Sequence, residues 1–129
     1  MKISTILFHA HSGLRWLIVV AAVAAVIFFG YSWLAKKYNK KPARILTAAY
    51  SGMLDMQVLL GLIFMFMTGV SRYRLEHMSV FIGVAVLAHL PRKWRDGADE
   101  IYFRNTFITV LATLVLIFVG VAVLPGNRW

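Results

Sequence analysis

Long apolar runs fill most of this 129-residue chain, and short polar segments separate them. A bilayer core is about 30 Å thick, so a helix that crosses it needs roughly 20 mostly apolar residues. The third run approaches that length only if it continues past Pro91 to Trp94. The pattern predicts four membrane-spanning helices, which cover Leu14–Ala35, Ile45–Val70, Leu75–Leu90 and Tyr102–Leu124.

Three short polar connections separate these runs. Lys36–Arg44 contains a proline, Gly69–Arg74 is a tight turn, and Arg92–Arg104 is rich in charged residues. Short connections force consecutive helices to be antiparallel. The sequence therefore predicts an all-α, integral membrane, up-down-up-down four-helix bundle that forms one domain over residues 1–129. Pro125-Gly126-Asn127 is expected to stop the fourth helix.

The formal charge of +9 is unevenly distributed along the chain. Positive charge gathers in cytoplasmic connections of membrane proteins, so the richer side is expected inside and both termini outside. We therefore interpret the basic residues mainly as signals that set the membrane topology, and we also expect them to contact anionic lipid. A nucleic-acid partner is not expected. The first and third connections hold Lys36, Lys37, Lys40, Lys41, Arg44, Arg92, Lys93, Arg95 and Arg104, whereas the other side holds Lys2, Arg15, Arg72, Arg74 and Arg128.

Composition removes several classes of function. The chain has no cysteine, which excludes disulfides, thiolate ligands, iron–sulfur clusters and covalent c-type heme attachment. It also lacks a phosphate-binding loop and a zinc-protease spacing such as HExxH. Hydrolytic chemistry therefore has no support, and whether the chain is an enzyme at all stays open.

Two histidines are expected near the outer surface. His11 lies just before the first predicted helix and His77 lies in the first turn of the third, so their depths match. Facing imidazoles are suitable axial ligands for a b-type heme, whose propionates could pair with Arg15, Arg72 and Arg74. The alternative is that His11 is a solvated or headgroup-contacting residue.

A second polar pair is expected deeper in the bilayer. Asp55 and His89 each lie 14 residues from the turn between the second and third helices, so they share a depth. A carboxylate inside a spanning helix is costly and needs a partner or a function. His77 and His89 point about 120° apart on an ideal helix, so His77 is predicted to face the first helix and His89 the second. The alternatives are a protonated Asp55 and a His89 that only marks the inner interface.

Five methionines allow a further interpretation. Thioethers bind soft metals, so a Cu(I) path is conceivable, but methionine is also a common apolar filler. A small transporter of protons or copper that uses Asp55 is therefore the weakest of the functional hypotheses. The residues concerned are Met53, Met56, Met65, Met67 and Met78.

Short motifs resemble a known group of proteins. The string His11-Ser12-Gly13-Leu14-Arg15-Trp16, Glu76-His77 and Ala88-His89 together resemble small four-helix bacterial membrane proteins of cytochrome b-like type. The resemblance covers most of the chain, and it implies a heme-bearing bundle in respiratory or photosynthetic electron transfer. Where that family has a histidine two positions before a glutamine, this chain has Asp55 before Gln57. The resemblance therefore supports one outer heme and not a second, inner one.

These observations lead to two hypotheses of different classes. The first is a bacterial cell-membrane electron-transfer subunit with one heme b held by His11 and His77, which exchanges electrons with quinone or with a larger membrane complex. The second is a cofactor-free accessory subunit of such a complex.

Overall fold

Residues 2–123 form four α-helices, in keeping with the four apolar runs of the sequence. The computed structural model describes residues 2–123, and every regular element in that range is helical. The helices are α1 (Ile3–Ala35), α2 (Lys40–Thr68), α3 (Arg72–His89) and α4 (Asp99–Ala122), with a short 3-10 turn, Leu90–Lys93, after α3.

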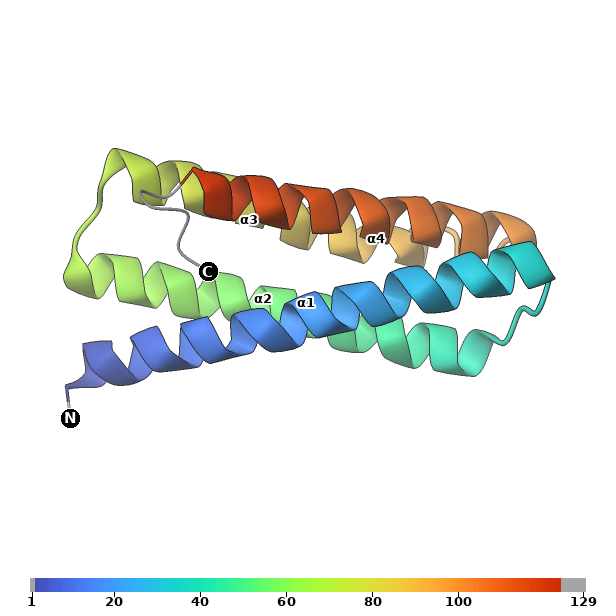
Figure 1. Cartoon of the computed structure of the whole chain (residues 1–129), viewed down its shortest axis with the longest axis horizontal. Coiled ribbons are helices and arrows are strands. Elements are labelled where there is room, and N and C mark those ends of the chain that lie inside the picture. Colours follow the sequence, from blue (N-terminus) through green and yellow to red (C-terminus); the bar gives the residue numbers. More distant parts are fainter. Residues whose placement is uncertain (1, 124–129) are drawn as a thin grey trace.

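Consecutive helices run in opposite directions, so the start of α1 and the end of α4 lie at the same end of the bundle (Figure 1). Both α1 and α3 pack against α2 and α4, which places α1 and α3 at opposite corners. The up-down-up-down arrangement is therefore confirmed. We call the end with residues 69–71, between α2 and α3, the turn end. The end with residues 36–39 and 90–98 is the basic end.

Three of the four helices, α1, α2 and α4, are long and apolar enough to cross a membrane. At 1.5 Å per residue, the 33 residues of α1 extend about 50 Å, more than a bilayer core requires. α3 is the exception, because its 18 residues include Arg72, Arg74 and Glu76. The sequence predicts four membrane-spanning helices, but α3, which contains the third apolar run, is not apolar enough to count as a candidate span. It completes the bundle by packing against its neighbours.

The surface and the core of the bundle are both apolar. The core contains Ile18, Phe29, Leu54, Phe103 and Ile117, which are at most 2% exposed. The outer surface also carries large apolar side chains, and lipid accommodates such a surface far better than water does. Among these outward residues are Val20, Ile27, Phe66 and Val86, each at least 65% exposed.

The helix ends differ from the predicted ones. α1 begins at Ile3, so His11 lies inside the helix and not before it, and α3 begins at Arg72, so His77 falls in the second turn. α2 starts at Lys40, five residues before the predicted start at Ile45. Pro42 falls in its first turn, where proline is tolerated because no backbone N–H is needed there. The stop expected at Pro125-Gly126-Asn127 lies outside the described residues.

The connection between α3 and α4 is also shorter than the predicted Arg92–Arg104. α4 starts at Asp99, so Asp99 and Glu100 form its first turn, where carboxylates interact favourably with the helix dipole. The turn end is tight: α2 ends at Thr68, and the next residue, Gly69, has a φ of 115°, a conformation that favours glycine. Ser71 then caps α3 by accepting a hydrogen bond from the Arg74 backbone N–H at 3.3 Å.

Candidate functional site

His11 and His77 meet inside the bundle near the turn end. Their ring centroids are 6.5 Å apart and their ring planes are inclined at 70°. They come from α1 and α3, which stand at opposite corners, so the pair bridges the interior diagonally. The structure thus brings together the two histidines that the sequence singled out, with His77 on the side of α1 as predicted.

The His77 ring is fixed by α4. Its Nδ1 lies 2.7 Å from the backbone oxygen of Gly120. A carbonyl only accepts, so Nδ1 of the neutral ring carries the proton and donates, which leaves Nε2 with its lone pair. Metal-binding histidines are commonly oriented by such a bond from the other ring nitrogen to a carbonyl. Phe81 packs beside the ring, with 4.7 Å between the centroids.

His11 is positioned by α2. The Gln57 side-chain Nε2 donates to the His11 backbone oxygen at 2.8 Å, and Gly61 leaves space for the ring. A Cβ on Gly61 would lie 3.1 Å from both His11 Cε1 and the Met78 Cε methyl. His11 Nδ1 and Gln57 Oε1 are buried polar atoms without a hydrogen-bond partner. Such atoms are uncommon in protein interiors, so this region has hydrogen-bonding capacity that the surrounding described side chains do not use.

The centroid separation of the two rings, 6.5 Å, is close to the one that two imidazole ligands of a single metal would have. A metal–imidazole bond is about 2 Å long, so rings on opposite sides of one metal stand roughly 6 Å apart, centroid to centroid. Within residues 2–123, no group of three or more His, Cys, Asp or Glu side chains could hold a metal ion. A bare ion would therefore lack ligands, whereas the iron of heme brings four porphyrin nitrogens and needs only two axial ones.

The three arginines predicted to accompany this site lie in different places. Arg15 is one turn from His11 and close enough to both imidazoles to act on them electrostatically. Arg72 pairs with Glu76 at 3.1 Å, and Arg74 donates to the Gly69 backbone oxygen at 2.9 Å. Arg15 is thus beside the histidines, while the other two arginines stabilise the turn end.

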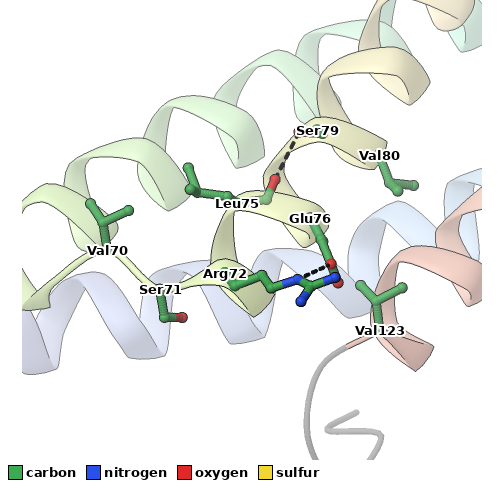
Figure 2. Close-up of a pocket in the computed structure, with 8 residues that line it drawn as sticks. All are labelled: Val70, Ser71, Arg72, Leu75, Glu76, Ser79, Val80 and Val123. Atoms are coloured by element: carbon green, nitrogen blue, oxygen red, sulfur yellow. Dashed lines mark hydrogen bonds and ion pairs between the residues drawn. The ribbon is translucent and has the colours of Figure 1, made fainter.

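A hollow of about 700 Å³ opens at the turn end, but it is separate from the histidines. Figure 2 shows Arg72 and Glu76 paired within it, with Leu75 and Ser79 on the same side of α3 and Val123 opposite, at the end of α4. His11 and His77 do not line it. Glu76 and His77 are consecutive residues with different environments, because Glu76 faces this hollow and His77 faces the interior.

Asp55 and His89 form the second predicted pair. The His89 Nε2 lies 2.8 Å and 3.0 Å from the two Asp55 carboxylate oxygens, which confirms the contact. Both side chains lie on the outer surface of α2 and α3 and are 51% and 35% exposed, respectively. Gln57 instead points inward, so Asp55 and Gln57 face different neighbours, as their spacing predicts.

The depth of this pair makes its exposure unusual. Asp55 is 15 residues from Lys40, where α2 begins, and 13 residues from Thr68, where it ends, or about 22 Å and about 20 Å along the helix axis. It therefore lies well within the apolar length of α2 and not at either end. The hydrogen bond to His89 reduces the cost of a carboxylate at that depth.

The methionines do not line one path. Met65 and Met78 are buried, whereas Met56 and Met67 are about half exposed. They lie on different faces of α2 and α3, as filler residues would. From the sequence, Met78 is only one of the possible copper ligands. In the structure its methyl group lies beside Gly61 and the His11 ring.

Gly120, Phe81 and Gln57 also belong to this site and were not assigned to it from the sequence. The sequence signals were weak: Gly120 is one of several glycines that permit close helix approach or leave room for a flat cofactor, and Gln57 is an amide in an apolar helix.

Comparison with known proteins gives no match, whether with family models, with curated proteins or with solved structures. The resemblance to cytochrome b-like proteins thus rests on the short motifs alone and stays a prediction.

Proposed function

We propose that this chain is a membrane electron-transfer subunit that holds one heme b between His11 and His77. The observation that carries the proposal is the pairing of these imidazoles across the interior, with the His77 tautomer set by Gly120 so that Nε2 is available. The two-ligand set fits a cofactor that supplies its other iron ligands itself.

The chain contributes position and environment to this function. Gly120 and Phe81 hold the His77 ring, and Gly61 gives the His11 ring its place. Arg15 supplies positive charge beside both rings, where a propionate would pair with it. Heme, when bound, would provide one-electron chemistry, and the apolar bundle around it would exclude water.

The proposed redox partner is quinone or another subunit of a membrane complex. The outward-facing Asp55–His89 pair supports contact with another subunit, because polar groups in lipid cost free energy that a protein interface would reduce. The same observation favours the second candidate, a cofactor-free accessory subunit. In that function His11 and His77 would be polar interface residues that contact neighbouring subunits, lipid headgroups or a cofactor held mainly by another chain.

The two candidates differ in whether the purified full chain carries heme b. Heme that co-purifies with the chain supports the electron-transfer subunit, whereas a folded chain without heme supports the accessory subunit.

We further propose that the chain resides in a bacterial cell membrane with both termini and the turn end outside. The proposal rests on the excess of Lys and Arg at the basic end. The chain has no native cysteine, so a single introduced cysteine is the only thiol that the reagent can label. In intact cells, a membrane-impermeant thiol reagent should label Val70→Cys, at the turn end, and not Lys41→Cys, at the basic end. Preferential labelling at position 41 would show that the topology is the opposite of the proposed one.

A further inference from the structure

A small cavity lies at the basic end, among α2, the 3-10 turn after α3, and α4. Its volume is about 30 Å³, and three arginines line it: Arg44, Arg92 and Arg95. Thr47, Ser51 and Tyr102, three residues that carry hydroxyl groups, also line it. Ser51 and Tyr102 are each only 1% exposed, so one side of the cavity belongs to the buried core.

The arginines are only partly paired with protein groups. Arg92 donates to the Ser51 hydroxyl at 3.3 Å. The Nε of Arg95 is buried and has no hydrogen-bond partner. Arg44 is 3.9 Å from Asp96, whose side chain is 85% exposed, so that pair is weak. Asp99 lies 2.8 Å from Lys40 and is thus engaged elsewhere.

Three guanidinium groups around one cavity repel each other, and a buried N–H donor without an acceptor is costly. An oxyanion offsets both costs, because several of its oxygens can accept charge-assisted hydrogen bonds. The planar fork of arginine matches phosphate geometry especially well.

The cavity size indicates how such an anion would enter. A volume near 30 Å³ is about that of one water molecule in the liquid, so the cavity admits one oxygen and not a whole phosphate. The rest of the group would stay at the mouth, where the Arg44 side chain is half exposed. The cavity is also at the end of the apolar helices, at the level where lipid headgroups are found.

We propose that this arginine cavity is a binding site for a phosphate group. The group would place one oxygen beside Arg95 and Ser51, with Arg44 and Arg92 holding the outer oxygens. Both an anionic phospholipid headgroup and free phosphate have this chemistry. The proposal is independent of heme, since the cavity lies at the opposite end of the bundle from His11 and His77.

The test uses the full chain in micelles of an alkyl maltoside, a neutral detergent that carries no phosphate group. Its melting temperature is followed while phosphatidylglycerol or, separately, inorganic phosphate is titrated, because a ligand that binds the folded state raises it. The variant is Arg95→Gln. Its matched control is Arg104→Gln, which removes the same charge at the same end, where Arg104 bonds only its neighbour Asn105 among the contacts observed for its side chain.

We expect at least one phosphate source to stabilise the wild type. Arg95→Gln should weaken the apparent affinity about tenfold, the effect of losing one charge-assisted hydrogen bond, while Arg104→Gln should change it less than about twofold. A response to phosphatidylglycerol alone would identify lipid as the source, and a response to inorganic phosphate would show that the free anion suffices.

Two results would overturn the proposal. One is equal weakening by the two variants, which would mean general attraction to a basic surface. The other is that neither phosphate source stabilises the wild type. If Arg95→Gln does not fold, Arg44→Gln replaces it, since Arg44 is half exposed and its loss leaves the core intact.

Discussion

Replacing either His11 or His77 with alanine is expected to abolish heme binding completely, whereas His9→Ala should leave it intact. A six-coordinate heme needs both axial imidazoles, and this interior provides only this pair in the described chain. His9 is exposed on α1 and its ring contacts Phe8, so it serves as the matched control two residues away. The measurement is the absorbance of the reduced protein for each variant, purified at equal yield.

The pattern of results also identifies the ligands. Loss of the bands in both single variants, with His9→Ala unchanged, assigns the ligands to His11 and His77. Full retention of heme in His11→Ala or in His77→Ala would show that the iron is held elsewhere, even if the wild type is a cytochrome.

The second prediction concerns the glycine that carries the His77 hydrogen bond. Gly120→Ala should destabilise the bundle by about 1–3 kcal/mol, the usual cost of overpacking a core. The new Cβ would overlap the Phe81 ring, whose Cδ2 would lie 2.9 Å away, and Val80 Cγ1 would be 3.1 Å away. Phe81 packs on His77, so the shift would also disturb the hydrogen bond between His77 and the Gly120 carbonyl.

Gly52→Ala is the matched control for this change. Gly52 is a helical glycine on α2, and no atom lies within 4 Å of the position its Cβ would take. Alanine is the better helix former by up to about 1 kcal/mol, so this variant should equal or exceed the wild type in stability. Thermal unfolding in detergent compares the two. Equal melting temperatures for Gly120→Ala and Gly52→Ala would refute the packing described around His77.

Much of the architecture could be predicted because membrane helices leave a clear pattern. Apolar run lengths gave the number of helices, and short connections gave their alternating directions. Depth and angle arguments also placed the polar residues. Positions 77 and 89 point to different neighbours, and His89 indeed meets Asp55 while His77 meets His11.

The helix starts were harder to predict. The first apolar run begins at Leu14, which suggested that α1 starts there, but helix formation depends on backbone hydrogen bonds and the helix extends outward to Ile3. Asp99 and Glu100 likewise read as loop residues, although acidic side chains favour the first turn of a helix.

The roles of Gly61, Gly120 and Phe81 could not be predicted because they depend on how each helix is rotated about its axis. In a soluble bundle, the polar face shows that rotation. Here both the lipid-facing and the core-facing sides are apolar, so periodicity indicates little about which residues meet. Gly120 becomes informative only when its carbonyl is seen beside His77.

The most direct test of the central claim is a reduced-minus-oxidised absorbance spectrum of the purified full-length chain, produced with an adequate heme supply and quantified against protein. The arrangement of His11 and His77 predicts the sharp bands of a low-spin, six-coordinate b-type heme, at one heme per chain. A folded, well-expressed protein with no heme bands would contradict it.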